Sequence, residues 1–306
     1  MAVAIEASEC WVVAGRAFGV ADLEQVRATV TWLPRLARRE LAETLCEHLE
    51  WFTAAGTPKR DACLKLLSRM EQAGLVKLPA LRPALGGGTW RESVATEETG
   101  VAASPQCGAL ADLMPVTLEP VTARAAVREW NATVERHHPL GYRGAFGFRL
   151  RYFIQGRGGC LGCLLLGGAA KAIAVRDQWI GWDARTRLNQ LARVVNNSRF
   201  LLLPEVRIPH LASHVLGQLA RRVGDDWEAH WGFRPLLLET FVDPARFRGT
   251  CYRAAGWNCL GTTSGRGLAR PGREYRSTPR LIFVKPLAAD FRRGLGVIPS
   301  SQGDGR

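Results

Sequence analysis

Between residues 120 and 290 the sequence alternates helical stretches with short apolar runs, and this alternation limits the fold more than any other feature. Helical periodicity, with apolar residues three or four positions apart, covers 120–136, 184–195 and 206–223. Apolar runs typical of strands lie at 148–154, 162–166, 172–175, 200–203, 236–243 and 282–287. Helices that alternate with strands predict an α/β (or α+β) core, which we assign to residues 113–290.

Residues 1–82 have the pattern of a small helical module of the DNA-binding type. Apolar stripes over 35–49 and 62–70 predict two helices joined by a turn, and 75–78 predicts a short strand after them. The second helix carries basic residues away from its apolar stripe, namely Lys59, Arg60, Lys65 and Arg69. Such a helix can lie in a major groove, so we expect a helix-turn-helix or winged-helix-like module. A helical hairpin with solvated charges is the alternative.

Two segments have the composition of flexible chain. Residues 83–112 contain three successive glycines, Gly86 to Gly88, among small polar residues, and hydrophobic periodicity disappears there. Such a stretch predicts a flexible linker that lets the module move relative to the core. Residues 291–306 are interpreted as a tail.

The charge of the chain favours a polyanionic partner. The formal net charge is +13, and residues 246–306 alone hold 12 Lys and Arg against 3 Asp and Glu. We therefore expect DNA as the partner, with RNA as an alternative, and a surface that only promotes solubility as the simpler explanation. The arginines expected to pair with phosphates in the core are Arg199, Arg253, Arg266, Arg270 and Arg273.

The sequence points to a cytoplasmic protein that does not bind a membrane. No uninterrupted apolar stretch is long enough to cross a bilayer, and the N-terminus lacks a signal-peptide pattern. The eight cysteines have no spacing typical of secreted scaffolds, so we expect reduced thiols.

Acidic residues near the expected strand ends are the candidates for chemistry. The candidate catalytic residues are Asp177, Asp183, Glu239, Asp243 and Tyr252. Ligands of α/β sheets favour the carboxyl ends of central strands, so we expect these residues to converge there. Glu239 and Asp243 could hold Mg²⁺ for phosphodiester cleavage, and Tyr252 could instead attack phosphorus. Salt bridges and helix caps for the carboxylates, and a buried core position for the tyrosine, are the alternatives.

Several long strings resemble a prokaryotic family that includes the A component of the Druantia anti-phage system. The most specific are RDQWIGW at 176–182 and NNSRFLLLP at 196–204. Further matching strings lie at 38–42, 46–51, 74–79, 211–214, 237–243 and 249–254. The resemblance implies a role in phage defence or with transposase-like mobile-element proteins, together with protein partners from those systems.

The core also resembles a Gcn5-related acetyltransferase fold in its second half. The strand at 200–203, the turn and helix at 206–223, the strand at 236–242 and the segment 252–257 follow in the same order. Acetyltransferases of that fold hold the pyrophosphate of coenzyme A with a glycine-rich turn. The corresponding turn, 206–212, has no glycine, and Pro209 lacks an N–H donor, so we do not expect coenzyme A to bind.

Three functional hypotheses remain open on these observations. The first is an enzyme that cleaves or joins DNA in defence or transposition, through a carboxylate-held metal or a tyrosine nucleophile. The second is a non-catalytic DNA-binding adaptor subunit of such a complex. The third is an acyltransferase, which the fold resemblance favours and the missing glycines oppose.

Overall fold

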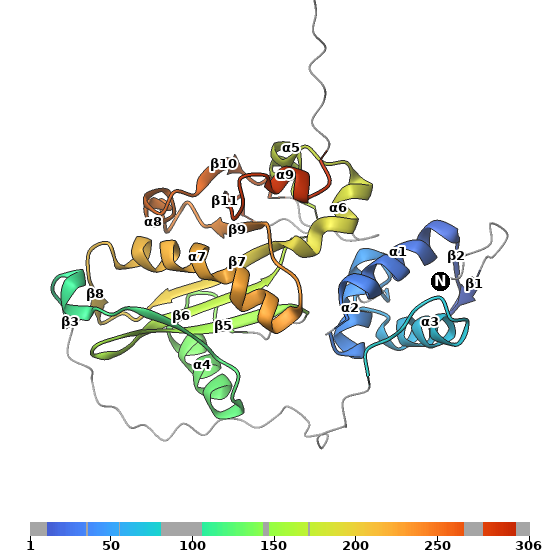
Figure 1. Ribbon diagram of the computed structural model, residues 1–306, viewed down its shortest axis with the longest axis horizontal. Coiled ribbons are helices and arrows are strands. Elements are labelled where there is room, and N and C mark those ends of the chain that lie inside the picture. Colours follow the sequence, from blue (N-terminus) through green and yellow to red (C-terminus); the bar gives the residue numbers. More distant parts are fainter. Residues whose placement is uncertain are drawn as a thin grey trace, which may run out of the picture.

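A computed structural model of the protein describes residues 11–34, 36–54, 56–80, 106–142, 147–170, 172–265 and 278–297. The described residues form a small N-terminal module and a larger core built on one mixed sheet (Figure 1). Within these ranges, no helix combines the length and the apolar character that crossing a membrane requires.

The N-terminal module is a β-hairpin followed by three helices. Its elements are β1 (Trp11–Val13), β2 (Arg16–Phe18), α1 (Val20–Trp32), α2 (Arg38–His48) and α3 (Arg60–Gln72). Helices α2 and α3 bury their predicted apolar stripes, and the left-handed Gly74 follows the end of α3. Residues 75–78 do not form the expected strand, since no neighbouring strand pairs with them within the described chain.

The core sheet has seven strands in the order β10-β11-β9-β7-β6-β5-β4. Its strands are β4 (Thr117–Pro120), β5 (Arg149–Gly156), β6 (Gly159–Gly168), β7 (Val194–Leu202), β9 (Leu237–Val242), β10 (Asn258–Thr262) and β11 (Leu281–Pro286). All neighbours are antiparallel except β7 and β9, which are parallel because a helix crosses over between them.

Helices cover both faces of this sheet. The helices of the core are α4 (Arg124–His137), α5 (Ala174–Ile180), α6 (Ala184–Gln190), α7 (Leu211–Trp231), α8 (Thr250–Ala254) and α9 (Phe291–Gly294). Helix α7 buries a long apolar stripe in the main hydrophobic cluster. Helix α8 joins the same cluster through Tyr252. Two separate clusters hold other helices: α4 packs through Trp130 and Val134, and α5 and α9 pack over β7, β9 and β11.

The α/β class predicted for the core is confirmed, and β7, α7, β9 and α8 follow in the expected order. One expected strand is wrong. Residues 172–175 do not pair in the sheet, and α5 begins at Ala174. Within this run, Ile173 and Val175 are partly buried and pack against the cluster around α5 and α9, whereas Ala172 and Ala174 are exposed. An apolar run of only four residues does not distinguish a strand from the start of a helix that packs against the core.

The segments expected to be linker and tail contain ordered elements. Strand β3 (Gln106–Cys107) pairs in parallel with β8 (Val206–Arg207), and a 3-10 turn, η1 (Leu110–Leu113), follows it. At the other end, α9 buries Phe291, and Leu295 after it is also buried. Residues 83–105 and 298–306 of the two segments lie outside the described residues.

The module packs against the core. Arg149 Nη1 at the start of β5 donates to Glu40 Oε1 of α2 at 2.6 Å. The main hydrophobic cluster is continuous across the two parts, since it contains Leu33 of the module and Phe148 of the core. In this structure the module is therefore docked on the core.

The aromatic cluster under α7 provides a test of this core. Trp227 is fully buried, and its ring centroid lies 6.1 Å from that of Phe148. Trp227→Ala should lower the free energy of unfolding by about 3–5 kcal/mol in urea denaturation, because a large buried ring leaves a cavity. Phe247→Ala is the control: Phe247 is 58% exposed, and its loss should change stability by less than about 0.5 kcal/mol. Equal effects of the two changes would contradict this packing.

Candidate functional site

Two of the predicted carboxylates meet at one buried arginine. Arg176 Nη1 donates to Glu239 Oε2 at 2.7 Å, and Arg176 Nη2 donates to Asp177 Oδ1 at 2.8 Å. The side chains of Arg176 and Glu239 are both fully buried. Both carboxylates of the Arg176 cluster (Arg176, Asp177 and Glu239) are thus held in ion pairs, which is the structural alternative that the sequence left open.

The Arg176 cluster has a satisfied hydrogen-bond shell. Asp177 also accepts hydrogen bonds from Trp182 Nε1 at 3.1 Å and from Arg187 Nη1 at 3.3 Å. These partners account for Arg176, Asp177 and Trp182 in the string 176–182, whereas Trp179 stacks on Phe291. A buried ion pair is tolerated only when further hydrogen bonds satisfy its charges. We therefore interpret the cluster as a structural element that ties α5 and α6 to β9.

The other two carboxylates cap local turns. Asp183 accepts from Thr186 N at 2.6 Å at the start of α6, and this hydrogen bond lowers the pKa of Asp183. Asp243 accepts from Ala245 N at 3.0 Å just after β9. Glu239 and Asp243 are four residues apart in extended chain, a separation of about 13 Å. The two carboxylates of the expected Mg²⁺ site therefore do not face one ion.

Within the described ranges, no group of three or more His, Cys, Asp or Glu is arranged to hold a metal ion. In the Arg176 cluster, a guanidinium already occupies the position between the two carboxylates.

Tyr252 lies in the buried interior beside the carboxyl-terminal half of β7. Its hydroxyl accepts from Asn197 Nδ2 at 3.3 Å and lies 3.5 Å from Thr240 Oγ1. The ring stacks on Phe283 with centroids 5.5 Å apart. Burial raises the pKa of Tyr252, so its phenolate is disfavoured, and the packing keeps the hydroxyl away from solvent.

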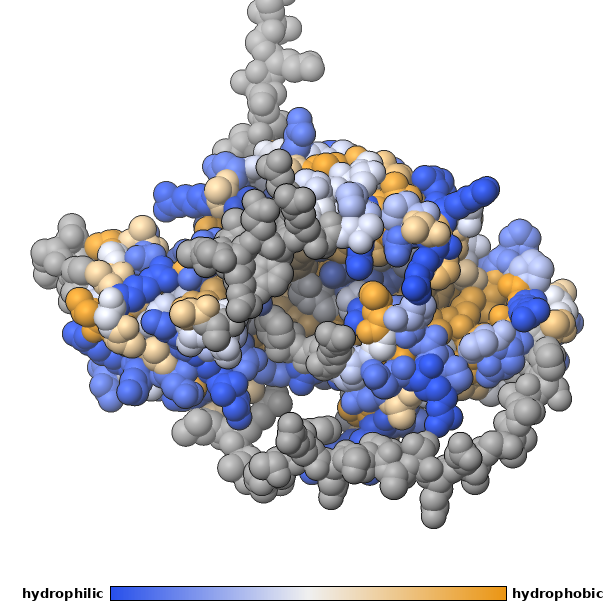
Figure 2. All heavy atoms as spheres, turned by 180° about the vertical axis from the view of Figure 1, so that it is seen from behind, coloured by the Kyte–Doolittle hydropathy of each residue, from blue (hydrophilic) through white to orange (hydrophobic). Residues whose placement is uncertain are grey.

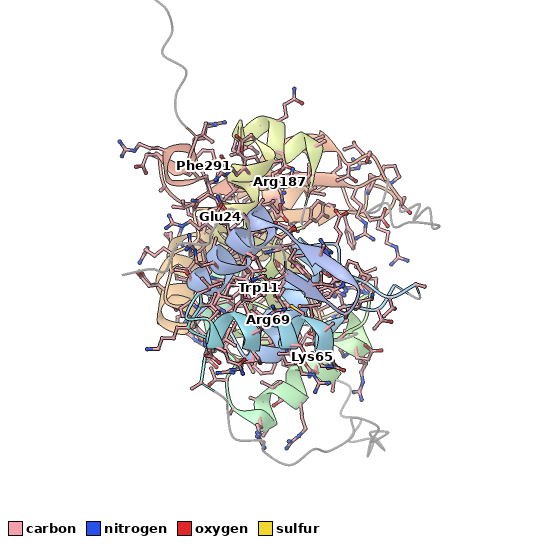
Figure 3. All side chains as sticks on the ribbon, turned by 90° about the vertical axis from the view of Figure 1, so that its right-hand side faces the viewer. Trp11, Glu24, Lys65, Arg69, Arg187 and Phe291 are labelled. Atoms are coloured by element: carbon pink, nitrogen blue, oxygen red, sulfur yellow. The ribbon has the colours of Figure 1, made fainter. Side chains whose placement is uncertain are left out.

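The basic residues expected on α3 differ in their surroundings. Arg60 Nη1 is paired with Glu43 Oε1 at 2.8 Å, and the Arg69 guanidinium lies 4.6 Å from the centroid of the Trp11 ring. Lys65 is exposed on the same helix (Figure 3). Lys59 is the N-cap residue of α3. The charge of Arg60 is thus largely balanced inside the module.

The core arginines also separate into groups. Arg253 is exposed on α8, and its guanidinium lies 5.1 Å from the Phe283 ring centroid. Arg199 lies on β7 and lines a cavity. Arg266, Arg270 and Arg273 lie outside the described residues.

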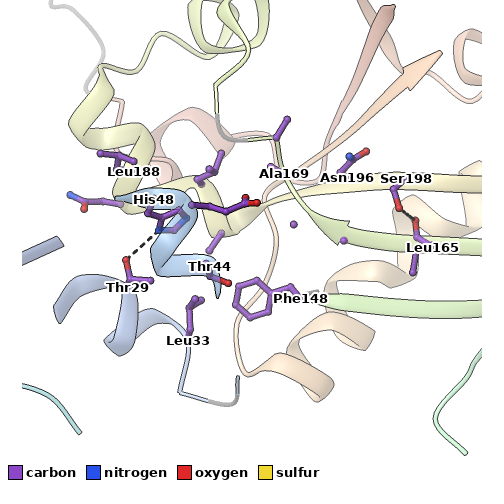
Figure 4. Close-up of a pocket in the computed structure, with 18 of the residues that line it drawn as sticks. Thr29, Leu33, Thr44, His48, Phe148, Leu165, Ala169, Leu188, Asn196 and Ser198 are labelled. Carbon is purple, nitrogen blue, oxygen red and sulfur yellow. Dashed lines mark hydrogen bonds between the residues drawn. The ribbon is translucent and has the colours of Figure 1, made fainter. Parts of the chain in front are cut away.

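The cavity that Arg199 lines is formed where the module meets the core, and we call it the interface cavity. Its volume is about 370 Å³. From the module, Thr29, Thr44 and His48 line it; from the core, the end of β6 and the middle of β7 do (Figure 4). Thr29 Oγ1 lies 3.5 Å from His48 Nδ1. We take this interface cavity as the candidate functional site.

The Arg176 cluster fixes one wall of the interface cavity. Ala170, a lining residue just after β6, donates its N–H to Glu239 Oε1 at 2.9 Å, and its carbonyl accepts from Arg176 Nη1 at 2.8 Å. Asn196, another lining residue, is the register partner of Glu239 across the parallel β7–β9 pair. The family-like strings 176–182, 196–204 and 237–243 therefore meet at this wall.

Arg199 gives the cavity a cation with carbonyl partners. Its Nε donates to Gly141 O at 3.0 Å, and its Nη1 donates to Ser198 O at 2.7 Å. Among the described residues, no carboxylate forms an ion pair with it. Burial, and next the positive charge of Arg280, lower the pKa of Arg199, so an anionic ligand would be stabilised here.

Sequence reasoning missed most residues of the interface cavity and one exposed aromatic. The cavity joins positions more than a hundred residues apart, such as Thr44 and Asn196, for which the sequence gives no pairing signal. Phe247 is 58% exposed between Arg246 and Arg248. An aromatic flanked by arginines was the available signal for it.

The turn before α7 has an unusual backbone. His210, the N-cap residue, adopts a left-handed conformation with φ of +64°. Pro209 precedes it and supplies no N–H, as the sequence indicated.

Removing one charge from the Arg176 cluster should lower the stability of the fold strongly. Glu239→Gln keeps the shape but leaves Arg176 undercompensated in the interior, so the free energy of unfolding should fall by about 3–5 kcal/mol in urea denaturation. Asp243→Asn, at a partly exposed cap, should cost less than about 1 kcal/mol. A stable Glu239→Gln protein would refute the structural role of the ion pair.

The partly buried position of His138 should make the stability of the fold depend on pH. Burial, and next the charge of Arg199, lower the pKa of His138 from 6.5 to about 4, and its Nδ1 accepts from Leu140 N at 3.1 Å. Below pH 6.5 the unfolded chain binds a proton that the folded protein does not, so this residue lowers stability as the pH falls toward 4.

His138→Asn retains a side-chain acceptor and removes the titration. In urea unfolding at pH 7.5 and pH 5, the variant should gain stability relative to the wild type at the lower pH. A difference between the two proteins that stays constant with pH would mean that His138 is protonated normally in the fold.

Comparison with known proteins identifies the family. The model of a family described as Druantia protein DruA matches residues 91–271, more than half of the chain. No curated protein matches. Among solved structures, an acetyltransferase of the GNAT family from Desulfovibrio desulfuricans has 13% identity and a TM-score of 0.33, over 56% of this chain and 99% of that one. The aminoglycoside acetyltransferase AAC(6')-Ib in complex with coenzyme A has 14% identity and a TM-score of 0.35, over 60% of this chain and 99% of that one.

At such TM-scores these structural similarities carry no conclusion about activity. The family match does not depend on them, and it covers the strings at 176–182, 196–204, 237–243 and 249–254. The chain belongs to the Druantia protein DruA family.

Proposed function

We propose that this protein is a DNA-binding component of a phage-defence system, and that it holds DNA without cutting it. Membership of the DruA family supports the defence role and implies that other proteins of the system are its partners. The net charge of +13 supports a polyanionic ligand.

The observation that carries the proposal is the exposed segment Arg246-Phe247-Arg248, which we call the RFR segment. Phe247 is 58% exposed, and both flanking arginines are also exposed. Among the exposed large hydrophobic side chains of the described residues, Phe247 is the one aromatic ring. The RFR segment connects β9 to α8, and the exposed Arg253 follows on α8.

The end of the core that carries this segment has the character of a mixed binding surface. Strand β8, with the exposed Arg207, lies at the same end of the core as α8 (Figure 1). Seen from behind, hydrophobic side chains gather among hydrophilic ones toward this end (Figure 2). Unpaired bases stack on aromatic rings while arginines pair with phosphates. This combination favours single-stranded DNA over an intact duplex.

The placement of the acidic residues supports binding without cleavage. Asp177 and Glu239 are paired with Arg176, Asp183 and Asp243 cap local turns, and these contacts use the oxygens that a metal ion would need. The exposed Lys65 and Arg69 on α3 are a second surface that we propose for contact with DNA.

The RFR segment can be tested by substitution. Phe247→Ala should weaken binding of a labelled single-stranded oligonucleotide by about 1–3 kcal/mol in fluorescence anisotropy, because one stacked base is lost. The double change Arg246→Gln with Arg248→Gln should reduce the slope of log K against log salt by about 1.4.

The control for these variants is Arg234→Gln, whose guanidinium is already paired with Asp225 and Glu228. It should leave the salt slope unchanged. Wild-type affinity and slope in both RFR variants would show that DNA does not bind at this surface.

A further inference from the structure

The interface cavity has the dimensions of a site for a small ligand. The proposed binding of DNA at the RFR segment does not involve this cavity. Its volume of about 370 Å³ lies within the range of pockets that bind small organic molecules. The lining comes from two parts of the chain that are docked by the Glu40–Arg149 ion pair. A ligand here would contact both parts at once.

Much of the cavity wall is apolar. Leu33 of the module and Phe148, Leu165, Leu188 and Leu191 of the core line it (Figure 4). An apolar wall of this kind can pack against a flat ring of a ligand and exclude water from it. Specific recognition of the ligand then depends on a few polar groups.

One of those polar groups is a cation suited to a phosphate. The Arg199 guanidinium is partly buried, its described partners are the carbonyls of Gly141 and Ser198, and Arg280 adds a second positive charge nearby. Planar guanidinium groups pair with phosphate oxygens through directional hydrogen bonds. An anionic ligand group would supply the missing counter-charge.

The other polar group is an acceptor that lacks a donor. Asn196 Oδ1 is buried, and no group of the described chain donates to it. A buried acceptor without a donor is unfavourable, and an N–H group of a ligand would satisfy it. This acceptor favours a ligand that carries an amino group as well as an anion.

We propose that the interface cavity binds a nucleotide whose base has an exocyclic amino group, with the phosphate at Arg199 and the base against the apolar wall and Asn196. Adenine and cytosine present such an amino group, and uracil does not. The nucleotide is either a free mononucleotide or one residue of a strand. Binding at this site does not rest on the RFR segment.

The test uses the full-length protein and isothermal titration calorimetry with AMP, CMP, UMP, adenosine and inorganic phosphate. AMP or CMP should bind, with UMP and adenosine each about tenfold weaker or more, because each lacks one of the two recognised groups. Arg199→Gln should weaken AMP binding about tenfold or more, and Arg199→Lys should recover part of the loss because it keeps the charge.

Two further variants separate the cavity from the rest of the surface. Ala28→Leu, which fills the cavity without changing its polar groups, should abolish AMP binding. Arg207→Gln, at an exposed arginine outside the cavity, should bind AMP as the wild type does. Folding of each variant is checked by circular dichroism.

A failure to bind AMP and CMP by the folded wild-type protein would overturn the proposal. Equal binding of UMP, or AMP binding unchanged in both Arg199→Gln and Ala28→Leu, would do so as well. An oligonucleotide that competes with AMP would identify the strand as the source, and an oligonucleotide that does not compete would identify the free nucleotide. Phe247→Ala should keep its AMP affinity, so this proposal and the DNA-binding proposal can fail independently.

Discussion

The ion pair between Arg176 and Glu239 is the interaction on which the centre of this structure depends. It joins α5 to β9 across the interior, and both side chains are fully buried. Because a buried charge is tolerated only when it is paired and hydrogen-bonded, the cluster requires Asp177 and the backbone of Ala170 in fixed positions. Those positions define the wall of the interface cavity, so the same residues that stabilise the core also shape its candidate site.

This arrangement changes the functional meaning of the acidic residues. Carboxylates at the strand ends of an α/β sheet suggest chemistry, yet here an arginine lies between the two nearest ones, and the other two terminate turns. The groups that remain available to a ligand are of a different kind: Arg199 with carbonyl partners, the acceptor of Asn196, and the exposed Phe247 with its arginines. They favour binding of nucleic acid or its components over hydrolysis.

The sequence was sufficient to predict the α/β core and the apolar faces of α2, α3 and α7, because burial imposes a period that is visible in one chain. It was insufficient for the run at 172–175, where four apolar residues fit a strand and a buried helix start equally well. The role of Glu239 depended on the packing of α5 against β9, which brings Arg176 to it, and packing between distant segments leaves no mark in a single sequence. The cavity was invisible for the same reason, since Thr44 and Asn196 meet only after the module docks.

The Arg176 cluster is thus a structural element, and we propose that the protein holds DNA intact. The most direct measurement incubates the full-length protein with end-labelled single- and double-stranded DNA, with and without Mg²⁺, and analyses complexes and strand lengths from the same reactions. We expect a salt-sensitive complex with single-stranded DNA and full-length strands under every condition. Shortened or protein-linked strands that form only with Mg²⁺ or through Tyr252, and that disappear in a folded Tyr252→Phe or Asp177→Asn variant, would contradict it.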